Sequence, residues 1–230
     1  MAGVLTQDDV DEIVFSAAGN GGHRQAAARF EDLAARPELH GEVSATVLLV
    51  HAGDQHGLAG SWDDAVRCYR AATALATSGD EAEIDPRVWL HDALMRRNRA
   101  RAEAREQAVG LPASRRAGET DHATEAESES ETETEITALR AEIKASRSAN
   151  PDVYAAVAET LADHGRLQEA HTWFTMGFQR CEGADIPDYM LHLLLVGRRA
   201  VRRDLGYPPD ELDRVADAYV DHLEPADEHA

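Results

Sequence analysis

One short ladder of residues occurs three times in the chain and restricts the folds that the chain can adopt. In each copy a glycine is followed five residues later by an alanine and, after four more, by an aromatic residue. The three copies are Gly21, Ala26 and Phe30; Gly60, Ala65 and Tyr69; and Gly165, Ala170 and Phe174. Residues four apart lie on one face of an α-helix, where the alanine lets a second helix approach and the ring fills the space beside it. The ladder therefore predicts a buried helix face in each copy.

The glycine of each copy stands where a preceding helix has to end. Glycine adopts, at little cost, the left-handed backbone conformation that commonly ends a helix. A run with helical spacing of apolar residues precedes each glycine, as in DVYAAVAETLADH before Gly165. Each unit is therefore expected to be a helix, a short glycine turn and a second helix. In the second copy, Gly53 and Gly57 are expected to weaken the first helix.

This unit resembles the tetratricopeptide repeat, a helical hairpin of about 34 residues. The segment LADHGRLQEAHTWF around Gly165 matches the centre of such a repeat best, whereas Gly21 and Gly60 are 39 residues apart. The resemblance implies an all-α chain of degenerate hairpins, stacked as a short solenoid that binds a peptide or partner protein in a groove. Residues 154–213 are also similar to tetratricopeptide-like proteins of actinobacteria. Some of those carry a Cys-rich zinc module, which two distant cysteines, Cys68 and Cys181, cannot supply.

Helices are also expected outside the three copies. One begins at Pro86, and both a further hairpin that turns near Asn98 and a single solvated helix fit its sequence. After the third copy, one helix from Pro187 and another after Pro209 are expected to cover the end of the stack. The inward stripe predicted for the last helix is Leu212, Val215, Tyr219 and Leu223.

An acidic segment divides the chain. Residues 118–135 hold eight acidic residues, no Lys or Arg and no large apolar side chain. Such a composition buries too little apolar surface to offset the entropy lost on ordering. The predicted organisation is a block of two to three hairpins over 1–109, a disordered acidic linker over 110–137, a hairpin with capping helices over 138–224, and a disordered tail over 225–230.

Charge and hydropathy exclude several classes of function. The net charge is −20, so a general nucleic-acid-binding surface is not expected. The sequence has no apolar run of membrane-spanning length and begins with the acidic stretch MAGVLTQDDVDEI, which is unlike a signal peptide. We therefore expect a cytoplasmic protein without membrane contact, whose two cysteines are buried thiols.

Two arginine clusters are the candidate partner-binding residues. The sequence RRNRARAEAR precedes the acidic segment, and GRRAVRR lies near a predicted helix end. The second cluster, which we take as the candidate partner-binding site, consists of Arg198, Arg199, Arg202 and Arg203. Arginine at a helix C-terminus also complements the helix dipole, so a purely structural role is an alternative. A third alternative is that the acidic segment lies over one of the clusters.

No pattern indicates catalysis. The eleven histidines give no pair at the i, i+4 spacing considered for a metal, and the phosphate-loop and nucleophile-elbow patterns are absent. We therefore predict no catalytic residue, no metal site and no cofactor. The predicted function is a non-catalytic scaffold for an unknown protein or peptide. A nucleic-acid-associated regulator that uses the arginine clusters, and an enzyme whose site is built across helices, are the alternatives.

Overall fold

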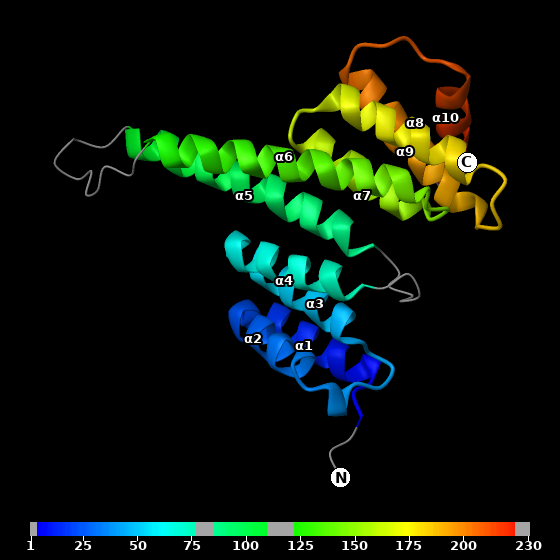
Figure 1. The fold of residues 1–230 in the computed structure, drawn as a ribbon. Helices are drawn as coiled ribbons and strands as arrows, with labels where there is room; N and C mark the ends of the chain where they lie inside the picture. Colours follow the sequence, from blue (N-terminus) through cyan, green and yellow to red (C-terminus); the bar gives the residue numbers. More distant parts are fainter. Residues whose placement is uncertain (1–3, 77–84, 110–121, 224–230) are drawn as a thin grey trace. The chain divides into compact units, whose positions relative to one another are not determined.

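The described part of the protein is helical throughout. A computed structural model of the chain describes residues 4–76, 85–109 and 122–223. Within those ranges the chain forms ten α-helices and one short 3₁₀ helix, and no strand, as predicted. The chain divides into two compact units, Met1–Ala141 and Glu142–Ala230, and each is described by itself (Figure 1). None of the described helices has the length and apolar character that a membrane crossing requires.

The helices follow one another along the chain. Those of the first unit are α1 (Gln7–Asn20), α2 (His23–Ala34), η1 (Pro37–Leu39), α3 (Ala45–Leu58), α4 (Trp62–Leu75) and α5 (Pro86–Val109). Helix α6 (His122–Ser146) begins in the first unit and ends in the second. The helices of the second unit are α7 (Pro151–Asp163), α8 (Leu167–Cys181), α9 (Asp188–Asp204) and α10 (Glu211–Leu223).

Neighbouring helices in the sequence pack against one another. In the first unit α1 contacts α2, and α3 contacts both α2 and α4, which in turn contacts α5 (Figure 1). In the second unit α7 packs on α8 and α9, while α9 also packs on α8 and α10. Polar side chains fix several helix starts: Thr6, Ser44 and Asn150 accept hydrogen bonds from the first-turn amides of α1, α3 and α7.

The three ladder glycines end helices as predicted. Gly21, Gly60 and Gly165 have φ angles of 70°, 72° and 72°, in the left-handed region. In each turn the next amide bonds back to the carbonyl five residues earlier, as in Ser61 N to His56 O at 2.8 Å. This bond is the signature of a Schellman turn, which satisfies carbonyls at a helix end. Gly206, with φ 73°, makes the same turn after α9, through Tyr207 N and Arg202 O at 2.9 Å.

The alanines and rings of the ladder form core. Ala26, Ala65 and Ala170 are 6%, 0% and 0% exposed, and Phe30, Tyr69 and Phe174 are 0%, 5% and 2% exposed. The prediction of a buried face in each copy is confirmed.

Two of the rings lie against glycines of a neighbouring helix. A Cβ added at Gly53 would lie 2.6 Å from the Tyr69 ring, and one added at Gly197 would overlap the ring of Phe174. Helix α3 runs on through Gly53 and Gly57, where packing of Tyr69 and Trp62 compensates for the low helix propensity of glycine.

Two segments bear on the predicted organisation. Helix α5 is continuous through Asn98, in line with the single-helix alternative, so the chain makes no hairpin turn there. Helix α6 occupies residues 122–146, most of which were predicted to be a disordered linker. Thr132, Ile136 and Leu139, at spacings of four and three, are 5%, 1% and 7% exposed, which gives α6 a buried face despite its charge. The rest of the predicted linker, residues 110–121, and the predicted tail lie outside the described residues.

Helix α10 is oriented differently from the prediction. Among the described side chains of α10, Asp213 and Ala216 are buried, at 0% and 1% exposed, whereas Val215 is 39% exposed. Leu212 and Tyr219 are only half-buried, and the side chain of Leu223 is outside the described set. Asp213 takes the buried position because its carboxylate pairs with Arg198 and Arg202 of α9. A prediction based only on the spacing of hydrophobic residues does not include such ion pairs.

Candidate functional site

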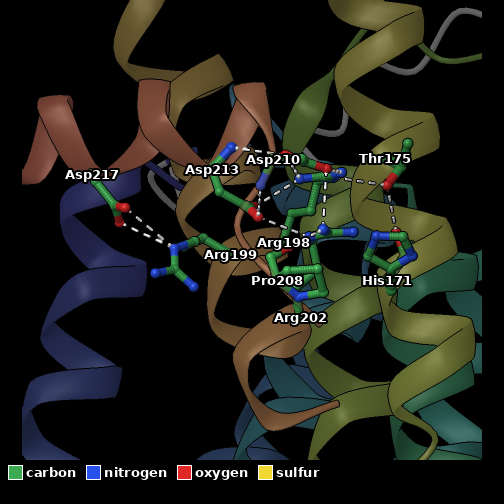
Figure 2. A network of polar contacts seen from close by, with 9 residues as sticks. All are labelled: His171, Thr175, Arg198, Arg199, Arg202, Pro208, Asp210, Asp213 and Asp217. Atoms are coloured by element: carbon green, nitrogen blue, oxygen red, sulfur yellow. Dashed lines mark hydrogen bonds and ion pairs between the residues drawn. The ribbon is translucent and has the colours of Figure 1, made fainter. Parts of the chain in front are cut away.

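The predicted arginine cluster lies on α9 and faces carboxylates at the start of α10 (Figure 2). The Arg198 side chain is only 6% exposed. Its Nη1 donates to Asp213 Oδ1 at 2.8 Å and to Asp210 Oδ1 at 3.1 Å, and its Nε donates to Thr175 Oγ1 of α8 at 3.2 Å. Arg198 therefore connects three helices from within.

Two more of the four arginines are also held by the unit itself. The Nε of Arg202 donates to Asp213 Oδ2 at 2.8 Å, and its Nη2 donates to the Pro208 carbonyl at 2.7 Å. Arg199 pairs with Asp217 at 3.2 Å. Arg203 alone of the four is widely exposed, with 73% of its side chain accessible and Asp204 at 3.9 Å. Three of the four guanidinium groups thus face carboxylates of the same unit, so the cluster as a whole does not present the free cations that a partner-binding site would need.

The carboxylates that hold the arginines also begin α10. The Asp210 amide donates to Asp213 Oδ2 at 2.9 Å, and the Asp213 amide donates to Asp210 Oδ1 at 3.0 Å. This reciprocal pair is a capping box, with aspartate at both of its positions. The hydrogen bond from Arg198 holds the pKa of Asp210 well below its ordinary value. The same two residues thus begin α10 and pair with the buried Arg198 and the half-buried Arg202.

The charge state of this cap predicts an acid sensitivity. The pKa of Asp210 is lower in the folded protein than its ordinary value of 3.8. The ionised Asp210 therefore stabilises the fold fully at pH values above 3.8, and this stabilisation is lost as the pH falls below 3.8 towards the folded-state pKa. Urea unfolding at about pH 5 and pH 3 should show a smaller loss of stability for Asp210→Asn than for the parent protein. Glu211→Gln removes an exposed carboxylate from the same turn and should leave the parent's loss unchanged. An equal loss in all three proteins would contradict the expectation.

Arginines of the other predicted cluster are paired within the first unit. Arg101 of α5 donates to Asp63 of α4 at 2.6 Å, and Arg97 donates to Thr132 of α6 at 3.0 Å. Arg70 of α4 pairs with Glu135 of α6. Helix α6 therefore contacts arginines of α4 and α5, but the cluster arginine Arg97 meets the neutral Thr132, and Arg70, which pairs with Glu135, is not a member of the cluster. The alternative in which the acidic segment lies over a basic cluster stays a prediction.

An apolar pocket opens where α8, α9 and α10 meet. It has a volume of about 330 Å³. Its lining residues are Phe178, Glu182, Asp188, Leu191, His192, Leu195, Leu212 and Val215. Five of them are hydrophobic and two are exposed carboxylates, and the lining includes no Lys or Arg. Concave apolar sites with a few polar groups are typical binding sites, so this pocket is the candidate functional site.

His192 holds one wall of the pocket through two contacts. His192 stacks on Tyr219 of α10 with ring centroids 4.3 Å apart, and its Nδ1 lies 2.8 Å from the Asp188 carbonyl. Tyr189 and Leu193, on the same helix, are 54% and 51% exposed and are not part of the lining.

The residues of the pocket were not predicted as a site. Leu212 and Val215 were assigned to the core because they form the hydrophobic stripe of α10. The sequence held one signal for this site. Asp210 and Asp213 stand three apart at the start of the last helix, and a cluster of arginines precedes them at residues 198–203. Pairing those charges would have rotated α10 and left its apolar stripe partly open.

The ladder residues are structural. Ala65, Tyr69, Ala170 and Phe174 are all buried, as their place in the repeat predicted. The Tyr69 hydroxyl also donates to Asp54 at 2.6 Å, and burial together with this carboxylate raises the pKa of Tyr69 far above its usual value. Cys68 and Cys181 are buried free thiols, and burial raises the pKa of both.

A scan against protein-family models and searches of curated proteins and of solved structures find no match for this chain. Its function therefore has to be inferred from its own residues.

Proposed function

We propose that this protein is a non-catalytic scaffold of tetratricopeptide-like hairpins that binds a cationic amphipathic segment of a partner protein. The observation that carries the proposal is the apolar pocket of the second unit, with Glu182 and Asp188 exposed in its lining. An apolar cavity of about 330 Å³ accepts one or two large hydrophobic side chains. A helix that presents such side chains at i, i+3 and i+4 is the usual occupant of a groove between helices.

The sign of the partner's charge follows from the surroundings of the pocket. Its lining carries two carboxylates without Lys or Arg, and the whole chain has a net charge of −20. Complementary charge speeds association and selects partners, so basic residues beside the hydrophobic anchors are favoured. The ion pairs of Arg198 and Arg202 leave little to support the alternative of a nucleic-acid regulator that uses this cluster.

A peptide titration tests the proposal. The probe is a synthetic helix of leucines at i, i+3, i+4 and i+7 with lysines elsewhere, and its counterpart carries glutamates in place of the lysines. Fluorescence polarisation should show binding of the lysine peptide and at least about tenfold weaker binding of the glutamate peptide, a difference of about 1.4 kcal/mol.

Two valines of α10 provide a matched pair of variants. Val215 lines the pocket and is 39% exposed, whereas Val220 is 38% exposed and is not part of the lining. Val215→Glu should weaken binding of the lysine peptide at least about tenfold, because it places a charge against the apolar anchor. Val220→Glu should leave binding unchanged. Equal effects of the two substitutions, or equal binding of both peptides, would contradict a binding role of the pocket.

A further inference from the structure

Three helices of the first unit bring metal-ligating side chains together at a place unconnected with the peptide pocket. Glu31 lies on α2, His56 on α3 and Cys68 on α4. One ligand atom from each of them lies within 4.8 Å of the other two. Cys68 is 0% exposed, and the side chains of His56 and Glu31 are 11% and 29% exposed. The cluster is therefore nearly buried and opens to solvent on the Glu31 side.

Hydrogen bonds already organise the group. His56 Nε2 lies 2.7 Å from Glu31 Oε1, and Arg67 Nη1 donates to Glu31 Oε2 at 2.7 Å. The second Arg67 nitrogen reaches Oε1 at 3.1 Å. The other ring nitrogen of His56, Nδ1, is buried and has no hydrogen-bond partner in the described part of the chain. A carboxylate, an imidazole and a thiol thus converge, while Arg67 balances the carboxylate from the outer side.

The chemistry of the cysteine argues against a nucleophilic role. Burial and the neighbouring Glu31 raise the pKa of the Cys68 thiol to about 12. A reactive cysteine needs a lowered pKa and access to solvent, and Cys68 has neither. The thiol is more useful as a ligand, since a bound cation displaces its proton.

We infer that Glu31, His56 and Cys68 form a site for a Zn²⁺ ion. The donors are one oxygen, one nitrogen and one sulfur, a mixed set that suits Zn²⁺ better than Mg²⁺ or Ca²⁺, which prefer oxygen alone. Three protein ligands leave a fourth tetrahedral position for water at the exposed Glu31 side. Zn²⁺ needs donors at about 2.0–2.3 Å, so the three side chains, whose ligand atoms lie within 4.8 Å of one another, have to close around the ion.

The protons balance on binding. The Cys68 sulfur gives up its proton to solvent and binds the ion as a thiolate. The proton that His56 Nε2 donates to Glu31 Oε1 in the metal-free protein leaves to solvent, and the neutral ring takes up its single proton on Nδ1 instead, so that Nε2 binds the ion through its lone pair. Glu31 gives Oε1 to the ion, and Oε2 stays with Arg67. No electron is transferred, and affinity rises with pH because protons are released.

Such an ion would join the two hairpins of the first unit. Glu31 belongs to the hairpin of α1 and α2, and His56 and Cys68 belong to that of α3 and α4. A metal bond between them adds its binding free energy to folding. This inference concerns the first unit and does not depend on the peptide site of the second.

Titration of the full-length, chelator-treated protein with Zn²⁺ tests the inference. Calorimetry should show one equivalent bound per chain, with affinity that rises with pH and a raised thermal midpoint. Co²⁺ should give the near-ultraviolet absorption of a thiolate ligand. Cys68→Ser should abolish that absorption and weaken binding more than about 100-fold, since loss of even an outer-shell partner costs about 10–100-fold. Cys181→Ser, which removes the other buried thiol, should retain both properties.

Arg67→Ala provides a second variant whose folding is expected to survive, because 55% of the Arg67 side chain is exposed. Removal of this competing cation frees both oxygens of Glu31, so affinity for Zn²⁺ should increase. A cluster that only links helices by hydrogen bonds would show lower stability in Arg67→Ala and no metal response. Absence of stoichiometric binding, or binding that Cys68→Ser and Arg67→Ala leave unchanged, would overturn the inference.

Discussion

Replacement of Arg198 by methionine is expected to lower the free energy of unfolding by about 3 kcal/mol, the lower end of the cost of breaking a buried ion pair. The Arg198 side chain is 6% exposed and that of its partner Asp213 is 0% exposed. Methionine replaces the aliphatic part of the side chain but leaves the Asp213 carboxylate with less compensation. The loss stays at the lower end because Arg202 Nε still donates to Asp213 at 2.8 Å.

Arg203 is the control, since it lies on the same helix with 73% of its side chain exposed. Arg203→Met should change stability by no more than about 0.5 kcal/mol in the same urea unfolding experiment. The double variant Arg198→Met with Asp213→Asn should be less unstable than the sum of the single variants, because the uncompensated charge is gone. If Arg198→Met costs no more than Arg203→Met, the cluster is not a structural network, and its role as a partner site is open again.

The hairpins could be predicted because their signal is local. A glycine, an alanine and an aromatic residue at offsets of five and four define one turn and one helix face, whatever lies elsewhere in the chain. Gly165, Ala170 and Phe174 show this: one has the left-handed φ of 72°, and the other two are buried. The start of α9 one residue after Pro187 was predictable for the same reason.

The orientation of α10 and the order in α6 could not be read from composition. In α10 an internal ion pair competes with the hydrophobic stripe, and the charges of Arg198 and Asp213 decide the outcome. In α6 the count of acidic residues concealed that Thr132 and Ile136 stand on one face. Net charge describes a whole segment, whereas packing depends on a single face of the helix.

The cluster of Glu31, His56 and Cys68 is related to the ladder. Glu31 directly follows the ladder ring Phe30, and Cys68 directly precedes the ring Tyr69. Stacked second helices place such neighbouring positions near each other, although they are 37 residues apart in the chain. Short-range spacing between ligands does not reveal a group whose three members lie on three separate helices.

Replacement of Phe174 by alanine should lower the free energy of unfolding by about 3–5 kcal/mol, because it removes a buried ring and leaves a cavity. Phe174 is 2% exposed, whereas Phe15, which serves as the control, is 74% exposed, so Phe15→Ala should cost no more than about 0.5 kcal/mol. Urea unfolding monitored by circular dichroism measures both, and equal losses would contradict a core role for the ladder ring.

Gly197, which lies against the Phe174 ring, allows a direct test of the packing between α8 and α9. A Cβ at Gly197 would overlap the Phe174 ring, so Gly197→Ala in the parent protein should destabilise it by about 1–3 kcal/mol through overpacking. In the Phe174→Ala background the overlap is gone, and the same substitution should stabilise α9 by about 0.5–1 kcal/mol, the usual gain of alanine over glycine in a helix. The sign of the effect must therefore reverse between the two backgrounds. An effect of the same sign and size in both backgrounds would mean that the Phe174 ring and Gly197 do not touch. It would contradict the packing of α8 against α9 described above.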